Sequence, residues 1–215
     1  MPEVTVLALR CPRCGGGLAG APHDVVFWCG ACGIPQEIAG AGFVERSGKL
    51  AAPVVPHAAG GFYLPVWALR VSYTCQWEDP EKAARARLIA PIEWVYVTGS
   101  AIHNAGYFGD PGMIFTEKRV LLAASEEGDR EAVVAGCARS LEDAKAFVQP
   151  HLLTIIDRRV DVTGLDLSVR VSDGILWGVP YREEVDGLRD SILGLTIPTA
   201  AIIEFSQIRA GQRMG

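Results

Sequence analysis

The sequence has no long apolar run and no secretory pattern at its start. No stretch of 18 or more apolar residues occurs, so no membrane-spanning helix is predicted. The most apolar segment, residues 192–205, is interrupted by Gly194, Pro198 and Glu204. Residues 1–10 carry an acid early and only a short apolar stretch, which does not fit a signal peptide. We therefore expect a cytoplasmic protein, and leave open a place at the inner face of the membrane through a partner.

Positive charge and catalytic motifs are also scarce. The chain carries 20 Lys and Arg against 25 Asp and Glu, a formal net charge of −5. Nucleic-acid binders usually present a basic stripe, so a nucleic-acid-binding regulator that uses the N-terminal cysteines is only the second hypothesis. No phosphate-binding glycine loop, nucleophile elbow or zinc-protease helix motif is present. The large excess of Arg over Lys, with abundant Ala and Gly, is typical of a bacterial genome rich in G and C.

Apolar residues are plentiful. They make up 49% of the 215 residues, whereas charged residues make up 21%. This composition predicts a folded chain, long enough for one sizeable core and a small satellite. An apolar excess at this length fits either a well-filled core or an apolar surface that a partner covers.

Four of the six cysteines form two C-x-x-C pairs, Cys11 with Cys14 and Cys29 with Cys32. Two thiolates at this spacing can bind one ion, and a glycine follows each pair where the chain must turn back. The 14 residues between the pairs suffice for a short hairpin. Without a secretory pattern, paired C-x-x-C motifs indicate a metal rather than disulfides. Four thiolates in a tetrahedron select zinc or iron.

Residues 9–40 resemble the zinc-ribbon family, in which the C-P-x-C-G-G knuckle is characteristic. The resemblance implies one structural Zn²⁺ held by all four cysteines. Such a site has no open coordination position and is not catalytic. Rubredoxins bind iron through similar knuckles, but their knuckles are normally farther apart, so iron is the alternative metal. Residues 1–40 hold two Arg against three acids, which favours a structural or protein-docking role.

The remainder of the chain predicts a mixed, strand-rich body. We expect a zinc ribbon over 1–40, a connector arm over 41–61 containing a short strand at 42–45, and an α+β body over 62–215. Strands are expected at 62–73, 93–98, 165–171 and 175–181, with a hairpin turn at Asp173-Gly174. Helices are expected at 81–88, 126–138 and 183–193, and after a capping box at Ser140 that Pro150 ends nearby. Strands and helices are mixed without a regular βαβ rhythm, which favours the α+β class.

Two aromatic segments share a pattern of aromatic, aliphatic-proline and aromatic residues. They are 62–67 and 176–181. Two related strand-helix units would explain the pattern, and chance similarity explains it at least as well. The first segment, Y-L-P-x-W, also faintly resembles uncharacterised bacterial zinc-ribbon proteins that carry Y-L-P-F-W. Val66 stands here in place of the Phe, and the resemblance implies no activity.

Residues 99–112, within the segment 99–119, are the most site-like stretch outside the cysteines. They combine glycines with His103, Asn104, Tyr107 and Asp110 after a predicted strand. No partner set completes a catalytic triad, so an enzyme built around this loop is the third hypothesis.

The leading hypothesis is a non-enzymatic accessory or assembly subunit of a larger bacterial complex, acting through protein–protein contacts. Interfaces are enriched in Trp, Tyr and Phe. The predicted contact elements are the ribbon and the two aromatic strands. The side chains expected to bind the partner are Tyr63, Trp67, Trp177 and Tyr181.

Overall fold

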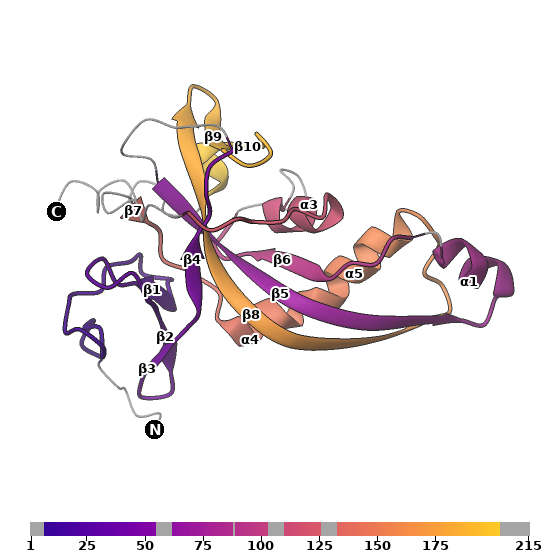
Figure 1. Ribbon diagram of the computed structural model, residues 1–215, viewed down its shortest axis with the longest axis horizontal. Coiled ribbons are helices and arrows are strands. Elements are labelled where there is room, and N and C mark those ends of the chain that lie inside the picture. The colour runs from indigo at the N-terminus through magenta and orange to yellow at the C-terminus, as the bar shows by residue number, and fades with distance from the viewer. Residues whose placement is uncertain (1–6, 55–61, 88, 103–109, 126–132, 203–215) are drawn as a thin grey trace.

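The computed structural model describes residues 7–54, 62–87, 89–102, 110–125 and 133–202. It is dominated by two long strands, β5 (Phe62–Trp77) and β8 (Leu165–Glu184). They run antiparallel, and every residue of β5 has a partner in β8. Figure 1 shows this pair as a long ribbon that ends beside helix α1, with the N-terminal strands near its other end.

Shorter strands extend the long pair into a mostly antiparallel sheet with the order β10-β9-β8-β5-β6. Strand β6 (Trp94–Thr98) pairs with β5, and β9 (Gly187–Asp190) joins β8 to β10 (Thr196–Ile197). Two short parallel additions complete the sheet. They are β4 (Gly48–Leu50) on β8 and β7 (Val133–Val134) on β5.

The two aromatic segments that share a pattern are paired with each other. Phe62 lies opposite Tyr181, and Val66 lies opposite Trp177. The predicted hairpin at Asp173-Gly174 is wrong, because β8 continues through these residues. The partner of β8 is the distant β5. Register shifts between Arg70 and Val71, where β8 has one extra residue, so a β-bulge replaces the predicted turn.

Side chains alternate between the two faces of the sheet and build two cores. One face, which includes Leu64, Val66 and Trp177, packs with α3 (Pro111–Glu117) and the turn of 3₁₀ helix η1 (Thr199–Ala201). The other face, which includes Trp67 and Leu69, packs with α4 (Leu141–Ala146) and α5 (Val148–Asp157). The period of two along β5 therefore explains why both faces are apolar.

The N-terminal residues form a separate three-stranded antiparallel sheet. Its strands are β1 (Val26–Trp28), β2 (Pro35–Ala39) and β3 (Gly42–Glu45), so the strand expected at 42–45 is confirmed. The described part of the expected connector, 41–54, holds β3 and β4. Strand β3 belongs to the small sheet, and β4 belongs to the large one.

Helices with local start signals are confirmed. Helix α1 (Pro80–Ala86) begins after Asp79, whose side chain accepts the main-chain N–H of Glu81. Helix α4 begins with the expected capping box, in which Ser140 and Asp143 satisfy each other's main-chain N–H groups. The strand-rich α+β class is thus observed.

Three helix predictions are wrong. Residues 183–190 end β8 and form β9, because the chain turns at Val185-Asp186 and leaves Val185 fully exposed. Of the helix expected at 126–138, residues 126–132 lie outside the described residues, and Val133–Val134 form β7 on the sheet. Pro150 does not end a helix, because it lies in the first turn of α5, where no intrahelical N–H bond is lost.

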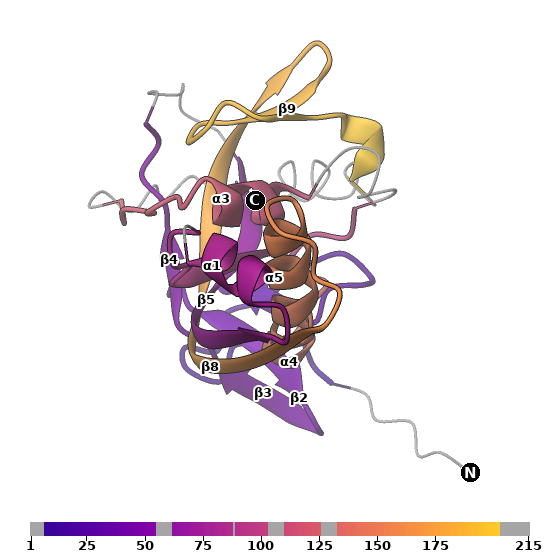
Figure 2. The ribbon, with the colours of Figure 1, turned by 90° about the vertical axis from the view of Figure 1, so that its right-hand side faces the viewer.

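The ribbon of β5 and β8 extends beyond the other strands toward α1. Figure 2 views the molecule from that end, with α1 and α5 in front. No described helix is long and apolar enough to cross a membrane.

Candidate metal centre

The four N-terminal cysteines converge on one point. Their sulfur atoms all lie within 4.8 Å of one another. The Sγ atoms of Cys11 and Cys32 are 3.7 Å apart, and those of Cys14 and Cys29 are 3.4 Å apart. Four sulfurs bound tetrahedrally at about 2.3 Å lie about 3.8 Å from each other, so the cluster has the size of a single metal site.

Two similar knuckles hold the sulfurs. The N–H of Gly15 donates to the carbonyl of Cys11, and the N–H of Gly33 donates to the carbonyl of Cys29. Both glycines have positive φ, 73° and 71°, which a residue with a side chain adopts only with strain. The repeated C-x-x-C-G sequence therefore specifies this geometry locally, and the sequence alone found the site.

The thiols of Cys29 and Cys32 differ in how readily they ionise. Burial opposes ionisation of Cys29, but the main-chain N–H of Cys32 and further hydrogen bonds outweigh it and lower its pKa to about 7. Burial raises the pKa of Cys32 to about 12. A metal ion requires thiolates, so its binding here would release protons and depend on pH.

Strand β1 joins the cysteine cluster to the body of the protein. Its middle residue, Phe27, packs in a small core with Cys11 and Cys29. Its outer residues, Val26 and Trp28, point the other way into the core that contains Trp67. Main-chain bonds in both directions between Val26 and Cys137 fix this contact at 2.8–3.0 Å. The N-terminal sheet that carries the cysteine cluster thus packs on the large sheet.

A buried ion pair reinforces the same contact. Both carboxylate oxygens of Glu37 accept from the guanidinium of Arg46, at 2.9 and 3.1 Å. The same carboxylate accepts the main-chain N–H of Leu141, the first residue of α4, at 3.1 Å. Glu37 is 4% exposed, so loss of the Arg46 guanidinium would leave a buried charge without its ionic partner.

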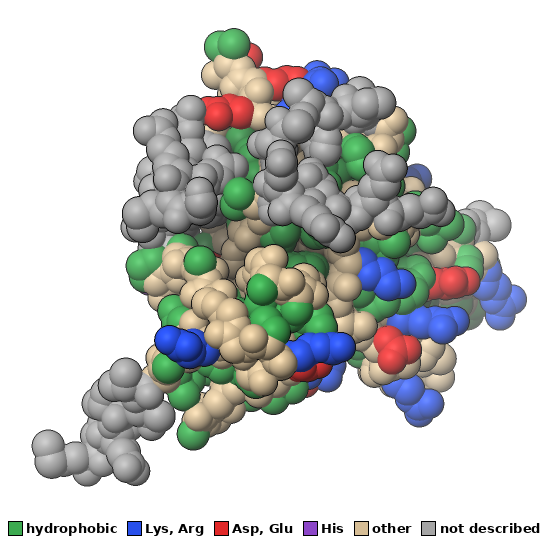
Figure 3. Space-filling view, turned by 60° about the vertical axis from the view of Figure 1, so that its left-hand side comes forward, with side chains coloured by type: hydrophobic (Ala, Val, Ile, Leu, Met, Phe, Trp, Pro, Cys, Tyr) green, Lys and Arg blue, Asp and Glu red, His purple; other side chains and the backbone are tan. Residues whose placement is uncertain are grey.

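Basic residues near the cysteines do not form a phosphate-binding surface. Arg13 pairs with Glu45 at 3.5 Å, and Arg46 is held by Glu37. Figure 3 shows the basic side chains interspersed with apolar and acidic ones over the described residues of this face. Phosphate binding draws on several unpaired cations, so this surface offers little support for nucleic-acid binding.

The aromatic side chains expected to bind a partner are inside the protein. Tyr63, Trp67 and Tyr181 are at most 1% exposed, and Trp177 is 7% exposed. The indole N–H of Trp67 donates to the carbonyl of Arg139 at 3.0 Å. These residues build the two cores and are not available to a partner in this structure. The pairing of β5 with β8, which buries them, has no local sequence signal.

The loop at 99–119 lies partly outside the described residues, which exclude 103–109. Its described part contains Asp110, which caps α3 and accepts the hydroxyl of Thr98 at 2.6 Å. The fold also brings Nε2 of His151, from α5, to 4.0 Å from the Asp110 carboxylate. This pair was missed by the sequence analysis, because nothing in the sequence links residues 41 positions apart.

His151 should make stability depend on pH. Burial lowers its pKa, as does Arg139, and together they outweigh the opposing effects of Asp110 and of the main-chain hydrogen bond with Tyr96. The unfolded chain therefore binds the proton at higher pH than the folded chain does, so the free energy of unfolding falls as pH drops below about 6.5. We expect this group to contribute at most about 1.4 kcal/mol per pH unit. Urea titrations from pH 7 to 5 should show a shallower decline in His151→Gln, and equal slopes would contradict the prediction.

The remaining cysteines are not part of the cluster. Cys137 is fully buried, and burial raises the pKa of its thiol to about 12. Cys75 is half-buried on β5, and burial raises the pKa of its thiol as well. Neither thiol is therefore a ready nucleophile, and neither belongs to the cluster of four that could bind a metal.

Comparison with known proteins adds nothing to this geometry. No protein-family model matches the chain, and no curated protein or solved structure is detectably similar to it.

Proposed function

We propose that the protein is a non-enzymatic, zinc-binding accessory or assembly subunit that acts through protein–protein contacts in a larger bacterial complex. The cysteine cluster would hold one structural Zn²⁺. Four thiolates complete a tetrahedral shell and leave no position for a substrate, so the ion's role is to fold the N-terminal sheet. That sheet packs on the body through β1 and Glu37.

The observation that carries the partner-binding role is the open ribbon of β5 and β8. Beyond Arg70, no described strand pairs with the outer edge of β5, and none pairs with the outer edge of β8 before Leu176. Long unpaired edges favour association with another strand, and soluble proteins usually cover or shorten them. Both edges lie at the end remote from the metal cluster (Figure 1). The ribbon therefore replaces the buried aromatic residues as the proposed contact surface.

The proposal is tested by affinity purification of the tagged, full-length protein from its native lysate, with and without nuclease. We expect the same protein partners in fixed stoichiometry under both conditions. Loss of the bound material after nuclease treatment would favour the nucleic-acid regulator instead. Recovery of the protein alone, including from solubilised membranes, would contradict the proposal and return attention to the enzyme hypothesis.

A further inference from the structure

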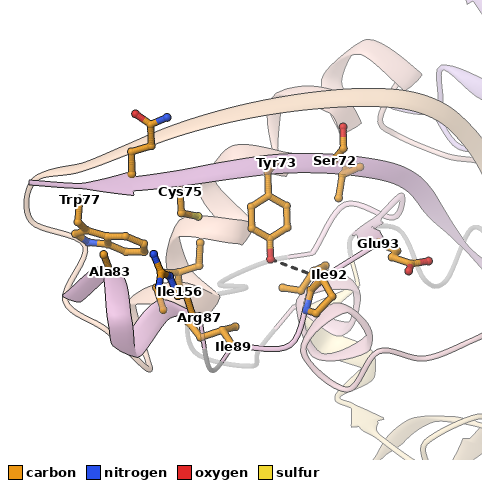
Figure 4. Close-up of a pocket in the computed structure, with 14 residues that line it drawn as sticks. Ser72, Tyr73, Cys75, Trp77, Ala83, Arg87, Ile89, Ile92, Glu93 and Ile156 are labelled. Atoms are coloured by element: carbon orange, nitrogen blue, oxygen red, sulfur yellow. Dashed lines mark hydrogen bonds between the residues drawn. The ribbon is translucent and has the colours of Figure 1, made fainter. Parts of the chain in front are cut away.

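The open edge of β5 borders an apolar groove. A cavity of about 660 Å³ lies between the end of β5, α1, residues 89–93 and Ile156 of α5. Its β5 wall includes consecutive residues, 71–73 and 75–77, from both faces of the strand. Figure 4 shows Tyr73, Cys75 and Trp77 pointing into the groove and Ser72 pointing away. Ser72 therefore lines the groove through its main chain, so the edge of the strand forms this wall.

The main-chain groups at this edge are ready to pair. The N–H of Val71 donates to the carbonyl of Glu93 at 2.9 Å. The main-chain N–H and C=O groups of the odd-numbered residues of β5 therefore point toward the β6 side. The main-chain groups of Tyr73 and Cys75 point to the same side, because this direction alternates from residue to residue along a strand. Within the described part of the chain, their N–H and C=O groups make no main-chain hydrogen bond on this side.

Pro91 explains why β6 does not cover this edge. Arg70 is paired with Trp94, and the same register continued outward would place Pro91 opposite Tyr73. Proline has no N–H to donate to the ladder. The chain instead leaves the sheet, and the N–H of Ile92 donates to the hydroxyl of Tyr73 at 3.3 Å. The position that a further strand would occupy is thus left as the groove.

Side-chain chemistry specifies what would fill the groove. Cys75 is a small residue between Tyr73 and Trp77, so a hollow remains on the groove side of its side chain (Figure 4). Strand β6 shows the pattern that fits, since its alternate residues Val95 and Val97 join the apolar core on this face. Arg87, which follows α1, lines the end of the groove nearest Trp77 and pairs with no acidic side chain in the described residues.

We propose that this groove binds an extended peptide segment of a partner protein, which adds to β5 as an antiparallel strand opposite Tyr73 and Cys75. The segment has an acidic residue near Arg87, an apolar residue two positions later in the hollow over Cys75, and a second apolar residue two positions after that. Main-chain bonds supply affinity, and the alternate side chains supply specificity. This inference rests on the proposed function and names the chemistry of its partner.

A synthetic probe tests it directly. The labelled peptide Ser-Glu-Thr-Leu-Thr-Val-Ser, blocked at both ends, should bind the full chain in fluorescence anisotropy. N-methylation of its leucine removes the N–H that would donate to Cys75 and should weaken binding about tenfold. N-methylation of the preceding threonine, whose N–H points away from β5, should have a smaller effect. The amides of Tyr73 and Cys75 should exchange with solvent in the free protein and become protected by the probe.

Protein variants locate the site. Ala86 lines the groove from α1, whereas Ala84 on the same helix is exposed and does not. Ala86→Trp should therefore weaken probe binding about tenfold or more, and Ala84→Trp should bind as the parent protein does. Arg87→Glu should reverse the preference for Glu over Lys in the probe.

Several outcomes would overturn the inference. The first is the absence of binding at millimolar probe. The second is unchanged affinity for the probe with N-methyl leucine, and the third is probe binding without protection of the Tyr73 and Cys75 amides. The last two would make the groove a site for small apolar molecules. Protection that rises with protein concentration without probe would assign the edge to a second copy of this chain. If Ala86→Trp still captures the cellular partners of the parent protein, this inference fails while the proposed function stands.

Discussion

Removal of the metal is expected to unfold the N-terminal sheet and to loosen the core beneath it. The small core around Phe27 includes cysteines of the cluster, so loss of the metal would disrupt the packing that holds this sheet together. Structural Zn²⁺ sites in small peptides contribute roughly 10–16 kcal/mol of apparent binding free energy at pH 7. Strand β1 also supplies Val26 and Trp28 to the main core, so its loss exposes apolar surface there. Chelation should therefore lower the melting temperature and accelerate amide exchange at Val26 and Cys137.

Two cysteine-to-serine variants distinguish the loss of a metal ligand from the general effect of losing a thiol. Cys29→Ser should reduce the metal content from one ion per chain to well below one, whereas Cys75→Ser should leave it at one. Elemental analysis measures the content and distinguishes zinc from iron. One ion per chain in both variants would contradict the assignment of the site.

Replacement of Trp67 by Ala is expected to be the most destabilising change in the body of the protein. The side chain is fully buried in the core of the α4–α5 face. Its removal leaves a cavity and takes the indole donor from the carbonyl of Arg139, at a cost of about 3–5 kcal/mol. This is a large share of the roughly 5–15 kcal/mol that stabilises a typical domain. Urea denaturation followed by circular dichroism measures the loss.

Trp77→Ala is the matched control, because this half-buried indole lies at the far end of the same strand. It should cost clearly less than Trp67→Ala. If Trp67→Ala kept full stability but lost partner binding, Trp67 would be a contact residue as the sequence suggested. That result would contradict its assignment to the core. Trp67→Phe, which keeps most of the volume without the N–H, should fall between the two alanine variants.

Local signals in the sequence were sufficient for the cysteine cluster and for two helix starts. The spacing of each C-x-x-C pair and the glycine after it act within five residues, so no distant part of the chain is needed. The same holds for the caps at Asp79 and Ser140, whose side chains bond main-chain groups two or three residues away.

Patterns that fit two structures misled the prediction. Val185, Leu188 and Ile192 have helical spacing, yet pairing with β8 and β10 makes Leu188 part of a strand. Asp173-Gly174 has turn chemistry, yet the pairing of β8 with β5 across it converts the irregularity into a bulge. In both places, burial of apolar side chains in the sheet outweighed a weak local preference.

The sequence by itself determined the cysteine cluster, the strand-rich α+β class and the apolar character of the long strands. Only the tertiary structure decided which side chains are inside and which edge is open. An aromatic strand has the same sequence whether it lies in a core or at an interface. The pairing of β5 with β8, about 100 residues away in the chain, buries Tyr63, Trp67, Trp177 and Tyr181. Strand β6 pairs with β5 only from Trp94 onward, so the edge at Tyr73 and Cys75 stays uncovered. Pairing between distant strands depends on packing that a short stretch of sequence does not encode.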